Sequence, residues 1–161
     1  MYICRQINLH PLTYCPMPSR NITTKKEKEA NYKSLISPQL MDEMKVKIQI
    51  IIVGQKKYKD KNYSAKQLAK DIGTNTRYIS AVINMRFHMN YTSLINKYRI
   101  EEAMDLLADY RNKELNIEEV SDMVGFANRQ SFYTAFCKMV QMTPRKFRIR
   151  HMQEYIEPKD R

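Results

Sequence analysis

Residues 64–73 read Ser-Ala-Lys-Gln-Leu-Ala-Lys-Asp-Ile-Gly, and residues 116–125, 52 positions later, read Asn-Ile-Glu-Glu-Val-Ser-Asp-Met-Val-Gly. Each stretch opens with a residue that favours a helix N-cap, and Gln67 or Glu119 follows three positions later, which is the pattern of a capping box. Each stretch ends at a glycine, which tolerates the left-handed backbone of a sharp turn. The two stretches therefore predict two short helices, each followed by a reversal of the chain.

A second helix is expected after each glycine. Asn75 is a good N-cap for the first of them, and apolar residues then recur at helical spacing. One extra residue in the second turn sets the offset between the copies to 53, so that Ile79 matches Phe132 and Ile83 matches Phe136. Two copies of a short helix, a glycine turn and a second helix predict two helix-turn-helix units in tandem.

A long amphipathic helix is expected between the two units, over residues 91–108. Its apolar side carries Leu94, Ile95, Tyr98, Ala103, Leu106 and Leu107, and its outer face is expected to carry Glu101, Glu102, Asp105 and Asp109. At about 1.5 Å per residue such a helix spans about 27 Å. Adjacent major-groove segments on one face of DNA lie about 34 Å apart. The helix is therefore a suitable spacer between two recognition helices on one duplex.

Upstream of the repeat, the pattern predicts one more helix. Ser37 is a favourable N-cap and Pro38 suits the first helical position. Leu40, Met44, Ile48, Ile51 and Ile52 follow at helical spacing, and Gly54 is expected to end the helix in a left-handed conformation. The β-branched cluster at residues 50–53 leaves a strand open as an alternative.

The predicted fold class is all-α, with two helix-turn-helix lobes joined by a long linker helix and preceded by a flexible arm and one extra helix. The expected divisions are an arm over 1–36, the capped helix and a basic loop over 37–62, a DNA-binding domain over 63–150 and a tail over 151–161. Within that domain, lobe 1 covers about 63–90, the linker helix 91–108 and lobe 2 about 116–150. With 161 residues and only three glycines, the chain does not suit collagen-like or loop-dominated β folds.

The net charge of +11 indicates a polyanionic partner, with nucleic acid first and an anionic membrane surface second. The longest apolar run, residues 50–53, is far short of the roughly 20 residues of a membrane helix. The three cysteines are an odd number in a chain without a recognisable signal peptide, so free thiols and a cytosolic location are expected. No metal-binding spacing occurs among the cysteines and histidines, and no cofactor is expected.

The region from about Tyr63 to Arg150 closely resembles the AraC/XylS family of bacterial transcription regulators. The residues that carry the resemblance are Leu68-Ala-x-x-Ile-Gly73, Tyr98-Arg-Ile-Glu-Glu-Ala103, Leu106-Leu107, Ile117-x-x-Val120, Val124-Gly-Phe126, Ser131-Phe132-x-x-x-Phe136 and Met142-Thr-Pro144-x-x-Phe147-Arg148. The resemblance implies a seven-helix, two-lobed domain that binds double-stranded DNA. RNA polymerase is a further expected partner, and no membrane partner is expected. Most family members carry an effector-binding domain ahead of this unit, but no small-molecule effector domain is visible in this sequence.

Carried over position by position, the resemblance implies DNA contacts from the second helix of each lobe. The first offers Thr76, Arg77, Ser80 and Ala81, and the second offers Asn128, Arg129, Gln130, Tyr133 and Thr134. Arg pairs well with guanine and Gln with adenine, each with about 1–3 kcal/mol of discrimination. Many relatives carry Arg where Ala81 and Thr134 stand, which suggests contacts to thymine methyl groups instead. Gln141 replaces a family glycine, and Gln suits that turn if the backbone is not left-handed.

Other interpretations remain open. The first alternative is an enzyme, because some alkylation-repair proteins attach this type of domain to a methyl-accepting module. That module needs four cysteines, but only Cys4 and Cys15 stand near the N-terminus of this chain. A shortened regulator or interaction module with weak DNA binding is the second alternative. Four phenylalanines at positions 126, 132, 136 and 147 are expected in the core, whereas Tyr78 and Tyr133 stand beside the DNA-contact positions. The basic run at 56–61 is either a solvated loop or a phosphate contact.

Overall fold

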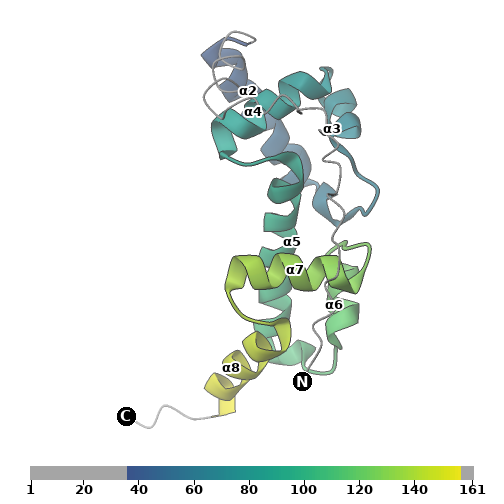
Figure 1. Cartoon of the computed structure of the whole chain (residues 1–161), viewed down its shortest axis with the longest axis vertical. Helices are drawn as coiled ribbons and strands as arrows, with labels where there is room; N and C mark the ends of the chain where they lie inside the picture. The colour runs from purple at the N-terminus through teal and green to yellow at the C-terminus, as the bar shows by residue number, and fades with distance from the viewer. Residues whose placement is uncertain (1–35, 157–161) are drawn as a thin grey trace, which may run out of the picture.

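The computed structural model describes residues 36–156, and side chains only as far as residue 152. Within that range the protein is all-α and elongated, as Figure 1 shows. The α-helices are α2 (Pro38–Gln49), α3 (Ala65–Ile72), α4 (Thr76–Phe87), α5 (Tyr91–Ala108), α6 (Ile117–Met123), α7 (Arg129–Val140) and α8 (Pro144–Ile156). Three short segments accompany them, η1 (Ile50–Gly54), η2 (Lys57–Lys59) and η3 (Tyr110–Asn112). Among the described helices, none is both long and apolar enough to cross a membrane.

The predicted repeat is present in the helices. Helices α4 and α7 begin 53 residues apart, and so do α5 and α8. Both predicted capping boxes form, since Ser64 pairs reciprocally with Gln67 and Asn116 with Glu119. Each lobe is therefore a short helix, a turn, a second helix and the start of a longer helix, in that order.

Each lobe has its own hydrophobic core, and α5 takes part in both. The first core contains Leu68, Ile79 and Ile83 together with Leu94 and Ile95 from the first part of α5. The second core contains Val120, Val124, Phe126, Phe132, Phe136 and Phe147 together with Ile100, Ala103 and Leu107 from the later part of α5. The four phenylalanines are buried as predicted. In Figure 1 the first lobe lies at the upper end of α5, and α6, α7 and α8 surround its lower half.

The turns after α4 and α7 are both left-handed. His88 ends α4 with a φ of 57° and Gln141 ends α7 with a φ of 59°. The condition under which Gln would suit this turn, a backbone that is not left-handed, is therefore not met at Gln141. The side-chain Nε2 of Gln141 donates to the Lys138 carbonyl at 2.8 Å, which offsets part of the strain.

The upstream helix begins as predicted but ends differently. Ser37 accepts a hydrogen bond from the Leu40 amide at 3.3 Å, and Met44, Ile48 and Ile52 enter the first core. Leu40, however, is 42% exposed. Gly54 is not left-handed, because α2 continues through the π-helical turn η1, and Lys56 takes the positive φ instead. The strand alternative for residues 50–53 is excluded.

Two further expectations need correction. Ile36, expected in the arm, is buried in the first core, and the rest of that arm lies outside the described residues. Helix α8 continues to Ile156, beyond the expected start of the tail at 151.

Candidate nucleic-acid interface

Helix α4 exposes mainly its first turn. Thr76 and Arg77 are exposed and Ser80 is half-buried. Asn75 caps the helix by accepting from the Tyr78 amide at 3.0 Å. Ala81 has no exposed surface and belongs to the first core, because α4 packs against α2, α3 and α5 at once. The prediction that Ala81 contacts DNA is therefore wrong.

Helix α7 exposes a longer polar face. Arg129, Gln130 and Thr134 are exposed, and Tyr133 is half-buried against the second core. Asn128, expected as a DNA contact, is exposed but serves as the N-cap by accepting from the Ser131 amide at 2.8 Å. The exposed residues thus begin at the N-terminal end of the helix, as they do on α4.

Arg129 is already engaged within the protein. Its Nη1 donates to Glu118 Oε1 at 2.7 Å, and its guanidinium carbon lies 5.1 Å from the centre of the Tyr133 ring. The interaction with Tyr133 and the negative charge of Glu118 raise the pKa of Arg129 above its ordinary value. The side chains of Arg129 and Glu118 are both 62% exposed, so the ion pair between them is weak. Arg129 can therefore leave Glu118 for an anion that binds it more strongly.

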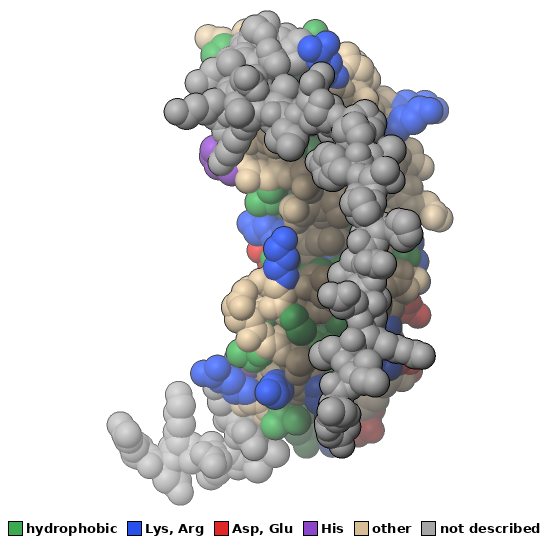
Figure 2. Space-filling model, in the orientation of Figure 1, with side chains coloured by type: hydrophobic (Ala, Val, Ile, Leu, Met, Phe, Trp, Pro, Cys, Tyr) green, Lys and Arg blue, Asp and Glu red, His purple; other side chains and the backbone are tan. Residues whose placement is uncertain are grey.

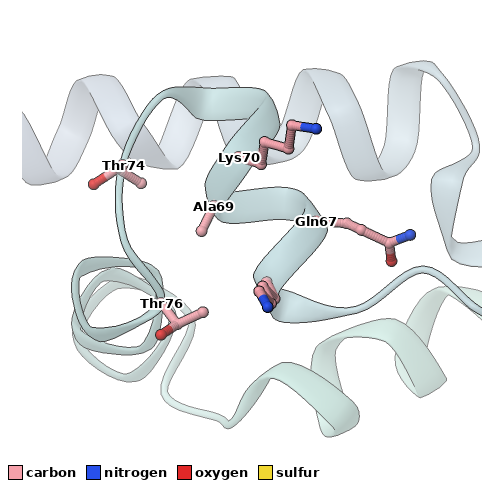
Figure 3. A pocket seen from close by; sticks show the side chains of 6 residues that line it. Gln67, Ala69, Lys70, Thr74 and Thr76 are labelled. Atoms are coloured by element: carbon pink, nitrogen blue, oxygen red, sulfur yellow. The ribbon is translucent and has the colours of Figure 1, made fainter.

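A groove of about 520 Å³ lies between α3 and the start of α4. Figure 3 shows the residues that line it, with Ala69 and Thr76 facing the same hollow. The exposed Lys66 and Lys70 of α3 also line the groove, beside the predicted DNA contact Thr76. Lysines that line a groove beside the N-terminal end of a helix make that groove favourable for a phosphate. The sequence interpretation did not consider these two lysines or the exposed Lys138, which lies one helical turn beyond Thr134.

The equivalent surface of the second lobe has the opposite charge. At the 52-residue offset, Glu118 stands where the first lobe has Lys66, and Asp122 stands where it has Lys70. All four side chains are exposed. Comparison of the two repeat copies would have revealed this charge difference from the sequence alone. The first lobe therefore offers the more favourable surface for a polyanion.

The basic run at 56–61 does not behave as a solvated loop. Lys59 and Lys56 pair with Glu102 at 2.6 and 3.5 Å, and Lys61 pairs with Asp122 at 3.0 Å. Glu102, expected on the outer face of the linker helix, is only 18% exposed in its side chain. Burial alone would raise the pKa of Glu102, but the hydrogen bonds from Lys59 and Tyr58 and the charges of both lysines lower it below its ordinary value.

The basic surface is not confined to this loop. On the face in Figure 2, Lys and Arg side chains recur from the top of the molecule to its lower half, and few Asp or Glu side chains are visible. On this face the positive charge is thus spread along the length of the molecule.

Comparison with known families identifies the class of protein. Residues 68–150, just over half of the chain, match the family model of a helix-turn-helix domain. Together with the repeat and the solved structures described below, this match shows that the chain belongs to the AraC-type family of helix-turn-helix transcription regulators. A search of curated proteins gave no significant match.

Solved structures of regulator domains are similar to this chain. One is the C-terminal domain of the two-component response regulator yesN from Fusobacterium nucleatum, with 29% identity, a TM-score of 0.56 and coverage of 63% of this chain and 93% of that one. Another is the C-terminal domain of AraT, a response regulator from Geobacillus stearothermophilus, with 26% identity, a TM-score of 0.57 and coverage of 66% and 83%. A third, an AraC-type transcriptional regulator from Chromobacterium violaceum, has 17% identity, a TM-score of 0.58 and coverage of 68% and 95%, and supports the fold alone.

Proposed function

We propose that the protein is a sequence-specific transcription regulator that inserts α4 and α7 into two successive major-groove segments of one DNA duplex. The observation that carries the proposal is the duplicated unit, in which each lobe exposes polar side chains at the N-terminal end of its recognition helix. The 18-residue helix α5, about 27 Å long, has a suitable length for two helices that meet successive turns of DNA. We infer a binding protein without catalytic activity that works in the cytoplasm, where bacterial DNA is found.

The proposed contacts divide into two kinds. We propose that Arg77, Gln130 and Thr134 contact base edges, with Thr76, Ser80, Asn128, Arg129 and Tyr133 as further candidates. Lys66 and Lys70, which line the groove between α3 and α4, are proposed to contact phosphates, and such contacts position the protein without discriminating between sequences. A contact with RNA polymerase is expected from the family resemblance alone.

Selection of bound fragments from a random DNA pool, followed by binding measurements on the selected site, tests this function. Arg77→Ala and Gln130→Ala should each weaken binding by about 1–3 kcal/mol and relax the preference at one base pair. Arg111→Ala provides the control, because Arg111 is an exposed arginine in η3 that pairs with Asp109. If both test variants bind as the control does, the two helices do not enter the groove. If no sequence is enriched, the chain is an interaction module with weak DNA binding.

A further inference from the structure

We propose that residues 56–61, hereafter the interlobe loop, hold the two lobes at one fixed separation and thereby set the number of base pairs tolerated between the two DNA segments. The proposal rests on the proposed function, since it concerns how α4 and α7 meet one duplex. It assigns a positioning role to Glu102 and Arg99, which do not belong to either recognition helix.

The interlobe loop is anchored in the first lobe. Tyr58 is buried in the first core, and so is Tyr63, just beyond the loop. The Tyr63 hydroxyl donates to Asp71 at 2.6 Å, and the Tyr91 hydroxyl donates to the Tyr63 carbonyl at 2.9 Å. The loop therefore moves together with the body of lobe 1.

The loop is also attached to the middle of the linker helix. The Glu102 carboxylate accepts from the Tyr58 hydroxyl at 2.7 Å and pairs with Lys59 at 2.6 Å. Arg99, one turn earlier on α5, donates to the carbonyl oxygens of Tyr58 and Asp60 at 2.5 and 3.0 Å. These bonds use both the side chains and the backbone of the loop, so they fix its position along α5.

The far side of the loop contacts the second lobe at the turn between α6 and α7. Gly125 packs so closely on the loop that a Cβ built there would lie 2.7 Å from the carbonyl carbon of Lys59. Lys61 pairs with Asp122 at 3.0 Å, and the Arg99 guanidinium carbon lies 5.4 Å from the centre of the Phe126 ring. This turn leads directly into α7, so the loop holds the start of the second recognition helix.

Two routes therefore connect the recognition helices, α5 itself and the interlobe loop. A single helix can bend, but a helix joined to a second connection resists a change in the separation of its ends. Inserting one base pair moves a DNA segment by about 3.4 Å along the axis and rotates it by about a tenth of a turn. A molecule held by both routes cannot follow that change, whereas a molecule held by α5 alone can adapt.

The test compares Glu102→Ala with Glu101→Ala. Glu101 is the neighbouring exposed glutamate of α5 and pairs with Lys97 at 3.8 Å, so its removal takes away the same charge without touching the interlobe loop. Pulsed electron spin resonance on the DNA-free full chain measures the distance between spin labels at Lys70 and Lys146, with the three cysteines replaced by serine. Binding is then measured on the selected site and on sites with one base pair added or removed between the two segments, and thermal melting verifies that each variant is folded.

We expect one narrow distance distribution for the parent and for Glu101→Ala. Both proteins should bind the sites with an added or removed base pair about tenfold more weakly than the selected site. Glu102→Ala should broaden the distribution and reduce that tenfold difference to about twofold or less. If Glu102→Ala gives a distance distribution as narrow as that of the parent, the proposal is overturned. It is also overturned if Glu102→Ala broadens the distribution but still binds the altered sites about tenfold more weakly than the selected site. If the parent enriches no DNA sequence, the proposed function fails together with the spacing claim, while the distance distributions still decide whether the loop fixes the lobes.

Discussion

Gly125 and Gly73 occupy equivalent positions in the repeat but are required for different reasons. Both have a positive φ, 95° at Gly125 and 78° at Gly73. A Cβ at Gly73 would have no neighbour within 4 Å, whereas a Cβ at Gly125 would collide with the backbone of Lys59. Gly73 is therefore needed only for its backbone conformation, and Gly125 is needed for conformation and for close packing.

Alanine substitution separates these two requirements. Gly73→Ala should cost about 1–2 kcal/mol, because only the left-handed backbone is disfavoured. Gly125→Ala should cost about 1–3 kcal/mol more than that, because the Lys59 backbone has to move. Urea denaturation of both variants measures the difference. Equal losses of stability would mean that the interlobe loop does not pack on Gly125.

The charge on the single residue Glu102 predicts how the stability of the protein depends on pH. Its pKa is lowered in the folded protein by Lys59, Tyr58 and Lys56, so the ionised form stabilises the fold. That contribution is present above the unfolded-state pKa of about 4.3 and is lost as the pH falls through the folded-state pKa. Glu102→Gln should therefore lower the melting temperature at pH 7 and should differ much less from the parent once the pH is below the folded-state pKa of Glu102. Glu101→Gln is the control. If the two substitutions lowered the melting temperature equally at pH 7, the ionised Glu102 would not be a particular source of stability.

At the scale of the elements, α2 is part of the first lobe. It packs on α4 and α3, and its buried residues Met41, Met44 and Ile48 share a core with Leu68 and Ile79. Its outer face exposes Leu40 and Val46, and η1 adds Ile50 and Val53. We therefore propose that the folded DNA-binding unit includes α2.

Two substitutions on opposite faces of α2 test this assignment. Ile48→Ala should destabilise the protein by about 2–5 kcal/mol, because Ile48 is fully buried. Val46→Ala should change the stability by less than about 0.5 kcal/mol, because Val46 is 53% exposed. Thermal or urea denaturation provides the comparison. If both changes were equally mild, α2 would not be packed on the lobe.

The local features of these elements were predictable from the sequence, and the long-range contacts were not. The capping boxes, the bounds of α5 and the phenylalanine core follow from spacing over a few residues. The burial of Ala81 depends on α2, which lies more than 30 residues upstream of it. Likewise, the run at 56–61 has the composition of a solvated loop, because its partners Glu102 and Asp122 lie about 40–60 residues away in sequence. Helical periodicity indicates which residues share a face, but it does not identify what covers that face.

At the scale of the whole molecule, the two lobes differ in charge at equivalent positions. Lys66 and Lys70 of α3 face the groove beside α4, whereas Glu118 pairs with Arg129 of the second recognition helix. We therefore expect the first lobe to contribute more to the electrostatic part of DNA binding.

Charge substitutions test this difference between the lobes. Replacing Lys66 and Lys70 by alanine should weaken binding about equally on all sequences and reduce the slope of log K against log salt by about 0.9 for each phosphate that is no longer neutralised. Glu118→Gln should strengthen binding, because it removes a negative charge and releases Arg129. Salt-titrated binding measures both effects. If the lysine variants kept the salt dependence of the parent, α3 would not lie along the phosphates.

The most direct test of the proposed function is a methylation-interference footprint on the selected DNA site, with the parent protein, Arg77→Ala and Gln130→Ala. Two recognition helices in successive turns predict two major-groove segments, centred about 10–10.5 base pairs apart on one face of the duplex. Arg77→Ala should weaken the interference in one segment and Gln130→Ala in the other, since the residues lie on α4 and α7. A single segment, or one pattern weakened identically by both changes, would contradict the claim that each lobe places its own helix in the groove.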